Sequence, residues 1–321
     1  MIEVSHLTKC YGDHCAVDDL SFTVEDGLVC GFLGPNGAGK STTMNIITGC
    51  LAATEGHVTV DGHDIFEEPI AAKRCIGYLP EQPPVYPDMT PAEYLAFIAE
   101  AKGVGRAERA AQIEKAVAVT GIGDVRDRLI RNLSKGYRQR VGIAQALLGD
   151  AKLIILDEPT VGLDPLQIIE IRDLIRSLGR RHTVILSSHI LSEVQAVCDR
   201  ILIINKGRLI ACDTPENLEG RFSGGVSYAL AVKAGGETAL QTLAAVEGVT
   251  RVTLDGEADG RCELTVEADP AAADMDERLS FALSGAQMPV LRMERREASL
   301  EDVFIRLTAD DAPAEKEGGE A

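Results

Sequence analysis

Short apolar runs separated by longer stretches of mixed polarity form the main pattern in the first two thirds of the chain. Runs rich in Val, Ile and Leu predict strands at residues 20–24, 28–33, 57–60, 153–156, 183–186 and 200–204. The runs near residues 30, 153 and 183 are continuously apolar, which is typical of parallel strands covered on both faces. The alternation of strands and helical stretches from residue 2 to about residue 218 therefore predicts an α/β domain.

Between residues 83 and 149 the strand pattern stops and helical signals take over. One helix is predicted to start at Thr90-Pro91-Ala92-Glu93. Thr90 can cap it, Pro91 suits the first helical position, and Glu93 completes a capping box. A second helix is predicted over residues 106–120. We interpret this block as a helical subdomain inserted into the α/β core.

The pattern of apolar and polar residues changes again after residue 222, where short predicted strands and helices succeed one another. The predicted elements are a strand at 228–232, a helix at 237–246, strands at 249–254 and 263–266, a helix at 274–283 and a strand at 290–294. This β-α-β-β-α-β order is the split βαβ arrangement of ferredoxin-like domains.

The predicted organisation is thus a large first domain, a small second domain and a tail. The first covers residues 1–220, with its helical subdomain at about 83–149. The second is a small α+β accessory domain over residues 222–308, which a last helix at 300–307 closes. Residues 309–321 are acidic and lack a large apolar side chain, so they are predicted to be a disordered tail.

Charge argues against nucleic-acid binding, and hydropathy argues against a membrane-spanning segment in this chain. The formal net charge is −18 and the sequence pI is about 4.8, which argue against a nucleic-acid partner because a phosphate polyanion would be repelled. No apolar run approaches the ~20 residues that cross a bilayer, and the N-terminus lacks the features of a signal peptide. We therefore expect a cytosolic protein that reaches a membrane only through a partner.

Eight cysteines are scattered along the chain, and no two of them form a C-x-x-C pair. This distribution predicts buried, reduced thiols rather than zinc ligands or disulfides.

A glycine-rich motif follows the apolar run at residues 28–33. The pattern G-x-x-x-x-G-K-[ST] is matched without exception by Gly34-Pro35-Asn36-Gly37-Ala38-Gly39-Lys40-Ser41. Glycines let the backbone curl so that successive N–H groups point at a phosphate, and the following helix adds its positive N-terminal end. We predict that residues 34–42, Thr42 included, hold nucleotide phosphates. Lys40 would reach the β- and γ-phosphates, and Ser41 would bind Mg²⁺.

Two adjacent carboxylates, Asp157 and Glu158, end the apolar run at residues 153–156. Buried strands rarely end in adjacent acids unless a cation lies nearby, and beside a phosphate-binding loop that cation is Mg²⁺. Asp157 is therefore predicted to hold the metal, usually through water, and Glu158 to orient or deprotonate the attacking water.

Further motifs give a specific resemblance. Leu133-Ser134-Lys135-Gly136-Tyr137, shortly before the strand that ends at Asp157, resembles the L-S-G-G-Q signature of ABC ATPases. The run Val161-Gly162-Leu163-Asp164-Pro165 resembles the D-loop of that family, and Ser187-Ser188-His189 resembles its switch histidine. The match spans residue 2 to about residue 218 with its motifs in order. It implies a P-loop NTPase fold with a RecA-like core.

The family also supplies expected roles. Tyr11 occupies the place of the aromatic that stacks on adenine, and His189 is expected to sense the γ-phosphate. Ser134 can cap a helix running to Leu148, so that its hydroxyl and the helix N-terminus form a second anion site. In the family two copies pair head to tail, and the signature residues of one, here Ser134 and Gly136 with Asp164 of the D-loop, complete the site of the other. The resemblance therefore implies ATP and Mg²⁺ as cofactors and a second copy as a partner.

Departures from the common ABC motifs make the resemblance more specific, to one group within the family. Lys135 and Tyr137 replace the first glycine and the glutamine of the signature. Glu81 stands where the Q-loop glutamine is expected, and Gln82 follows it, so both are candidates to serve Mg²⁺. These variants resemble ATPase subunits of ABC-2-type exporters, including drug, antibiotic and gliding-motility members.

The predicted function is ATP hydrolysis that powers export through a separate membrane permease, with the chain at the inner face of the cell membrane. Residues 83–105 would receive the cytosolic helices of that permease. The alternative is a soluble ABC ATPase that remodels a cytosolic assembly without transport.

Overall fold

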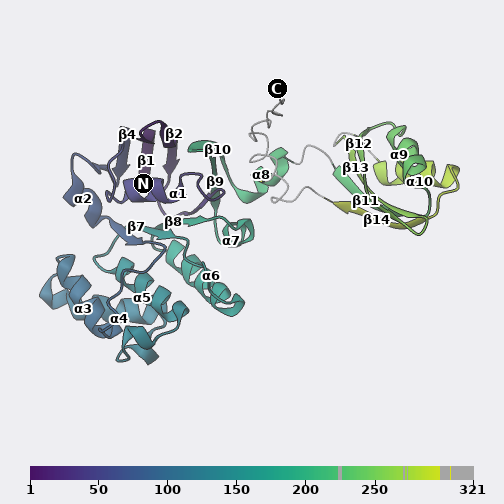
Figure 1. Cartoon of the computed structure of the whole chain (residues 1–321). Coiled ribbons are helices and arrows are strands. Elements are labelled where there is room, and N and C mark those ends of the chain that lie inside the picture. The colour runs from purple at the N-terminus through teal and green to yellow at the C-terminus, as the bar shows by residue number, and fades with distance from the viewer. Residues whose placement is uncertain (223–225, 270–271, 273, 297–303, 305–321) are drawn as a thin grey trace, which may run out of the picture. The chain divides into compact units, whose positions relative to one another are not determined.

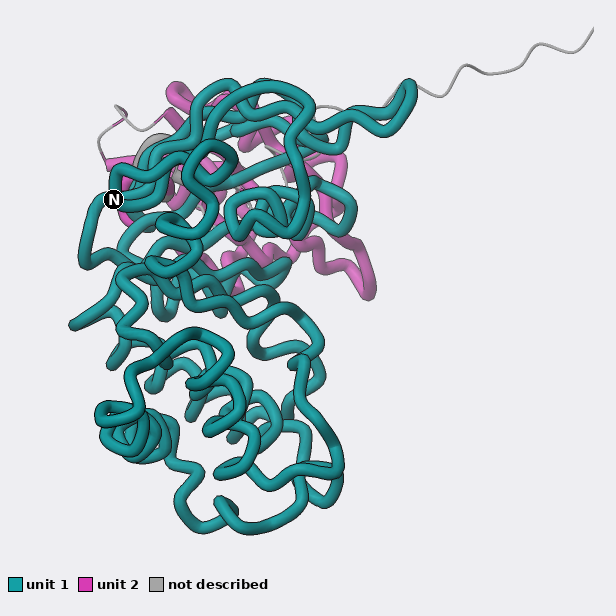
Figure 2. The backbone as a smooth tube through the Cα atoms, turned by 90° about the vertical axis from the view of Figure 1, so that its left-hand side faces the viewer, with its two compact units in different colours: residues 1–215 teal, residues 216–321 magenta. Residues whose placement is uncertain are grey.

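The structure, a computed structural model, describes residues 1–222, 226–269, 272, 274–296 and 304. The chain divides into two compact units, Met1–Pro215 and Glu216–Ala321, which Figure 2 colours separately. Of the helix predicted at 300–307 only Phe304 is described, and the predicted tail at 309–321 lies outside the described residues. The predicted domain limits stay predictions.

Two β-sheets form the centre of the first unit (Figure 1). The antiparallel sheet has the order β2-β1-β4-β5, formed by β1 (Ile2–Tyr11), β2 (His14–Val24), β4 (Glu55–Val60) and β5 (His63–Asp64). The larger sheet has the order β10-β9-β3-β8-β7-β6, formed by β3 (Val29–Leu33), β6 (Ile76–Leu79), β7 (Leu153–Asp157), β8 (Thr183–Ser188), β9 (Arg200–Asn205) and β10 (Arg208–Asp213). Its strands are parallel except for β10, which pairs antiparallel at one edge. All six predicted strands are present, and the predicted α/β class is confirmed.

The parallel strands are buried as their apolar runs predict. Every residue of β3, β7 and β8 is buried. Helix α1 (Lys40–Ile47) contributes Met44, Ile46 and Ile47 to a core that also contains residues of both sheets. This packing fixes α1, and with it the glycine-rich loop, against the carboxyl end of β3.

The predicted helical block is also present. It contains α3 (Pro91–Ala101), α4 (Arg106–Thr120) and α5 (Lys135–Leu147), which Figure 1 shows grouped beside the larger sheet. These helices have a core of their own, centred on Tyr94, Leu95 and Val141. The capping box of α3 is confirmed: the side chain of Thr90 accepts from the N–H of Glu93, whose carboxylate accepts from the N–H of Thr90. The other described helices before residue 215 are α2 (Pro69–Arg74), α6 (Pro165–Gly179), α7 (Leu191–Gln195) and two short 3-10 helices at Gly123–Val125 and Ile130–Asn132.

The second unit has the predicted β-α-β-β-α-β succession. Its elements are β11 (Val226–Val232), α9 (Gly236–Ala244), β12 (Val249–Ala258), β13 (Arg261–Ala268), α10 (Met275–Gly285) and β14 (Val290–Arg296), after α8 (Pro215–Phe222). The sheet order is β12-β13-β11-β14, and every pair is antiparallel. Leu230, Leu243, Leu264 and Leu279 are fully buried at its core.

The prediction of buried, reduced thiols is wrong for Cys10 and Cys15, which form a disulfide. These residues face each other across the hairpin between β1 and β2, with their Cα atoms 3.9 Å apart. The antiparallel register brings them together, and the spacing of the cysteines in the sequence does not reveal that register. Six cysteines are free. Cys30, Cys198 and Cys262 are buried as predicted, and Cys75 and Cys212 are half-buried. Cys50 is exposed, so the predicted burial is wrong for it as well.

Within the described part of the chain, no helix is both long enough and apolar enough to cross a bilayer.

Candidate nucleotide site

The glycine-rich loop folds back on the lysine that ends it. Lys40 is 6% exposed, and its Nζ donates to the carbonyl oxygens of Gly34 at 2.7 Å and Pro35 at 3.2 Å. Burial lowers the pKa of Lys40, while the carboxylates of Glu158 and Asp157 act in the opposite direction. The ammonium group is thus held by acceptors that a phosphate can replace.

Two glycines allow the loop to lie this close to its neighbours. Gly39, at the N-cap of α1, has φ 103°, and a Cβ built there would lie 2.4 Å from the carbonyl oxygen of Ala16. A Cβ on Gly34 would lie 2.5 Å from the carbonyl oxygen of Ile204. A side chain at either position would therefore displace the loop from the sheet.

Asp157 lies at the carboxyl end of β7 beside the first turn of α1. The hydroxyl of Ser41 donates to its Oδ1 at 3.4 Å, and the hydroxyl of Ser187, at the end of β8, donates to the same oxygen at 2.5 Å. Ser187 also accepts from the N–H of Glu158 at 2.9 Å. The sequence reasoning missed Ser187 as a positioning residue, because nothing in its local pattern distinguishes it.

Glu158 lies between two cationic or ionisable groups. Its Oε1 is 3.7 Å from Nζ of Lys40, and both its carboxylate oxygens are within 3.1 Å of Nδ1 of His189. The side chain is 10% exposed, and its backbone has φ 46°, in the left-handed region that costs a non-glycine residue energy. This backbone turn directs the carboxylate away from the strand and toward the loop.

Glu193 links the segment that carries Glu158 to the segment that carries His189. The carboxylate of Glu193, in α7, accepts from the hydroxyls of Thr160 at 2.5 Å and Ser188 at 3.2 Å. Ser188 in turn accepts from the N–H of Ile190. The segment after β7 and the segment after β8 therefore hold Glu158 and His189 at a fixed separation.

These residues surround a cavity of about 550 Å³, here called the nucleotide cavity. Predicted site residues that line it are Tyr11, Asn36, Gly37, Gly39, Lys40, Ser41, Thr42, Glu81, Glu158 and His189. Gly34, Pro35 and Ala38 belong to the loop without lining the cavity. His14, Ala16 and Val161 line it as well, and the sequence reasoning missed them. Tyr11 is 52% exposed, and Nζ of Lys9 lies over its ring, 5.1 Å from the centroid.

Three further predicted residues line a different cavity, here called the signature cavity, whereas Asp157 lines neither of the two. Ser134, Gly136 and Asp164 are brought together there, at the N-terminal ends of α5 and α6. Ser134 caps α5 as predicted, accepting from the N–H of Tyr137, and Asp164 caps α6. The signature cavity shares no lining residue with the nucleotide cavity.

Glu81 and Gln82 differ in position. Glu81 lines the nucleotide cavity, whereas Gln82 lines only the adjoining groove that Lys135, Arg138 and Gln139 also border. This geometry favours Glu81 over Gln82 near the phosphates.

The oxygens at the end of β7 suit a magnesium ion. Mg²⁺ prefers oxygen ligands and commonly takes one or two from protein and the rest from phosphates and water. Ser41 supplies a hydroxyl and Asp157 a carboxylate beside the loop. Among the described residues no cluster of three or more His, Cys, Asp or Glu side chains could hold a metal unaided. The donor set therefore fits an ion that arrives with a nucleotide.

Comparison with known proteins agrees with this geometry. The family model for ABC transporters matches residues 17–161. The linearmycin resistance ATP-binding protein LnrL of Bacillus subtilis is 33% identical over 96% of this chain and 98% of its own length. The daunorubicin/doxorubicin resistance ATP-binding protein DrrA of Streptomyces peucetius is 34% identical over 98% of this chain and 95% of its own.

A solved structure of similar fold is the ATP-binding cassette MJ0796, a dimer in a post-hydrolysis state with ADP and phosphate. It has a TM-score of 0.60 at 25% identity, over 67% of this chain and 98% of that one. The predicted P-loop fold with a RecA-like core is thereby confirmed. The chain belongs to the ABC transporter ATP-binding proteins and is an ATP-binding, ATP-hydrolysing subunit of such a transporter.

Proposed function

We propose that two copies of this subunit bind ATP between them, head to tail, and drive export through a separately encoded membrane permease. The observation that supports the pairing is the division of the predicted site residues between two cavities. The nucleotide cavity holds Lys40 and Glu158, whereas Ser134 and Asp164 lie in the signature cavity. In the pair, the signature cavity of one copy closes on the γ-phosphate that the other copy holds.

Within one copy, each side chain has a distinct part in the reaction. Tyr11 stacks on adenine, and residues 34–42 surround the phosphates, with Lys40 exchanging its carbonyl partners for phosphate oxygens. Ser41 and Asp157, with Glu81 nearby, would hold Mg²⁺, which would supply positive charge to neutralise the phosphates. Glu158 takes the proton of the attacking water. His189, which lies against Glu158, contacts the γ-phosphate.

Dimerisation that depends on ATP is the direct test of the pairing. The Glu158→Gln chain, which should retain ATP, is expected to double its mass in light scattering when Mg-ATP is added. The added variant Ser134→Glu places a carboxylate where the partner's γ-phosphate would lie, so it should leave the chain monomeric. The control is the double variant Glu158→Gln/Glu67→Gln, whose second change lies at an exposed residue and should leave dimerisation intact. A Glu158→Gln chain that stays monomeric at saturating ATP contradicts the proposal.

An exposed aromatic pair supports docking of a membrane partner on the helical subdomain. Tyr86 and Phe97 are 50% and 44% exposed, and their ring centroids lie 5.6 Å apart. Beneath them Tyr94 is fully buried and donates from its hydroxyl to the carbonyl of Pro84. Exposed aromatics on a rigid base are typical anchors for a partner helix. We infer that residues 83–105 receive cytosolic helices of the permease, which places the chain at the inner face of the membrane.

Phe97→Asp tests this docking surface. It is expected to lower the fraction of chain that sediments with native membranes at least about tenfold, because it removes a central apolar contact. Phe281→Asp, on a residue 73% exposed in the second unit, is the matched control. Equal sedimentation of Phe97→Asp and wild type would exclude this surface.

Export is the direction that the relatives favour. LnrL and DrrA are resistance proteins, and each aligns with nearly the whole of this chain. By similarity we infer outward transport of a toxic compound. The alternative, a soluble ATPase that remodels a cytosolic assembly, has no comparable support. The net charge of −18 continues to argue against a nucleic-acid partner.

A further inference from the structure

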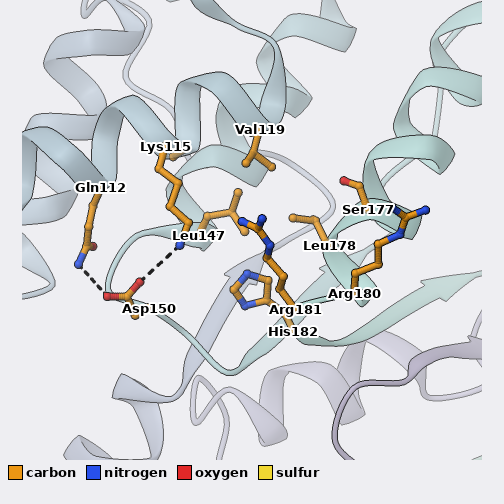
Figure 3. Close-up of a pocket in the computed structure, with 11 residues that line it drawn as sticks. Gln112, Lys115, Val119, Leu147, Asp150, Ser177, Leu178, Arg180, Arg181 and His182 are labelled. Atoms are coloured by element: carbon orange, nitrogen blue, oxygen red, sulfur yellow. Dashed lines mark hydrogen bonds and ion pairs between the residues drawn. The ribbon is translucent and has the colours of Figure 1, made fainter.

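Another pocket in the first unit lies apart from the nucleotide and signature cavities. Figure 3 shows it between α4, the end of α5 and the end of α6, and its volume is about 270 Å³. None of its lining residues lines either of the other two cavities. It is here called the interhelix pocket, and neither the nucleotide chemistry nor the docking of a permease uses it.

The floor of the interhelix pocket is apolar. Ala116 and Val119 from α4, Leu147 from α5 and Leu178 from α6 line it. Ala116 and Leu178 are buried, whereas Val119 and Leu147 are only half-buried, so apolar surface remains open in the pocket. Filling it would remove that surface from water.

The rim is basic in a chain whose net charge is −18. Lys115, Arg180 and Arg181 stand around the opening, and the one carboxylate among the lining residues is that of Asp150. Asp150 is already engaged, since it accepts from Gln112 at 3.0 Å and lies 3.9 Å from Nζ of Lys115 (Figure 3). In the described part of the chain, no hydrogen bond or ion pair is recorded for either guanidinium group. Figure 3 shows the guanidinium group of Arg181 beside Leu147 and that of Arg180 beyond Ser177, so Arg181 is the cation that faces the apolar floor without an anion.

We propose that the interhelix pocket binds a small, dissolved organic anion with an apolar body, such as an aromatic sulfonate or a medium-chain carboxylate. The body fills the floor at Val119 and Leu147, and the acid group is held by Arg181, with Lys115 on the same side of the pocket. Guanidinium groups suit this task because they offer paired donors to carboxylate, sulfonate or phosphate oxygens. Ser177 and His182 add polar groups at the wall. The Nδ1–H of His182 donates to the carbonyl of Ala151, which fixes the orientation of its ring.

A ligand in the interhelix pocket would contact both α5 and α6, and the N-terminal ends of these two helices line the signature cavity. Leu147 ends α5, which Ser134 caps at its other end, and Leu178 lies in the last turn of α6, which Asp164 caps. Binding would thus restrain α5 against α6. We expect the ligand to change ATP turnover as well as to bind. The reason is that a ligand that binds one arrangement of α5 and α6 more tightly than another favours that arrangement.

The binding test uses 8-anilinonaphthalene-1-sulfonate, whose fluorescence rises in apolar surroundings, with the full-length chain. Wild type should show one saturable site. Arg180→Gln/Arg181→Gln should weaken binding at least about tenfold, because the charge-assisted contact from Arg181 and the positive charge of the rim are lost. The matched control is Arg106→Gln/Arg128→Gln, which removes the same charge from two exposed arginines of the same unit and should leave binding unchanged.

Four further ligands, one of them an anionic phospholipid vesicle, make the test decisive. N-phenyl-1-naphthylamine, which has the same apolar body without the sulfonate, should bind at least about tenfold more weakly than the anion. Decanoate should displace the probe, and inorganic sulfate at the same concentration should not. Binding that the Arg180/Arg181 variant leaves intact, equal binding of the neutral analogue, or displacement only by anionic phospholipid vesicles would each overturn the proposal.

Coupling to the nucleotide site has its own readout. A saturating concentration of decanoate should change ATP turnover of the wild-type chain and of the Arg106/Arg128 control by the same factor. It should leave turnover of the Arg180/Arg181 variant unchanged. Equal changes in all three chains would show an effect away from the pocket and would overturn the coupling.

Discussion

Glu158→Gln is expected to bind ATP as wild type does and to hydrolyse it at least about a hundredfold more slowly, the scale for losing a general base. The amide keeps the shape of the side chain and can still accept from Nδ1 of His189, which lies 3.0 Å from Oε2 of Glu158. It cannot take a proton from the attacking water. Phosphate release measures turnover, and titration with a fluorescent ATP analogue measures binding.

The control for this variant is an exposed acid at the surface, Glu67→Gln, which should turn over ATP normally. Near-normal hydrolysis by Glu158→Gln would remove Glu158 from the catalytic role. Loss of ATP binding by the same variant would instead assign Glu158 to holding Lys40, from which its Oε1 is 3.7 Å away.

Lys40→Ala is expected to weaken ATP binding at least about a hundredfold, because a desolvated cation–phosphate contact is lost. In the free protein the ammonium group is satisfied by the carbonyls of Gly34 and Pro35 and by Glu158. Alanine leaves the Glu158 carboxylate facing the phosphates without this cation between them. Equilibrium titration with an ATP analogue is the measurement.

Lys152→Ala is the matched control for that loss of charge. Lys152 precedes β7, at the end of the strand opposite Asp157, and pairs with Asp61 at 2.6 Å. Its removal should leave ATP affinity within about twofold of wild type, since an exposed pair contributes little. Equal affinities for Lys40→Ala and wild type would contradict the assignment of the loop.

The sequence predicted the parallel strands β3, β7, β8 and β9 and the capped helices well, because their signals are local. The continuous apolar runs of β3, β7 and β8 and the capping box at Thr90 need no knowledge of distant contacts. The same holds for the phosphate-binding loop, whose glycines and lysine are adjacent in the chain.

Strand β1 escaped prediction for a physical reason. Its pairing with β2 shifts register between Val4 and Leu7, and His6 at φ 51° breaks the alternation of buried and exposed positions. Strand β6 is only four residues long, and its Gly77 packs so closely on α5 that a Cβ would lie 2.1 Å from the carbonyl oxygen of Ala146. Neither the irregular register of β1 nor the short, glycine-containing β6 produces a periodic pattern of apolar residues.

Residues that act through distant neighbours were also missed. Ser187 supports Asp157 and Glu158 only because β7 and β8 are adjacent and parallel, with Asp157 opposite Ser187. The disulfide of Cys10 and Cys15 likewise depends on strand register. The unengaged Arg181 of the interhelix pocket likewise becomes visible only when α6 is placed against α4.

The central claim is that this ATPase subunit drives a separate membrane permease, and co-purification tests it most directly. Tagged Glu158→Gln chain would be isolated from gently solubilised native membranes with Mg-ATP present, beside a Glu158→Gln/Phe97→Asp control. We predict a polytopic membrane protein in near-equal amount with the first chain and little with the second. Recovery of only a homodimer or of cytosolic partners with both chains would contradict the permease assignment and favour a soluble ATPase.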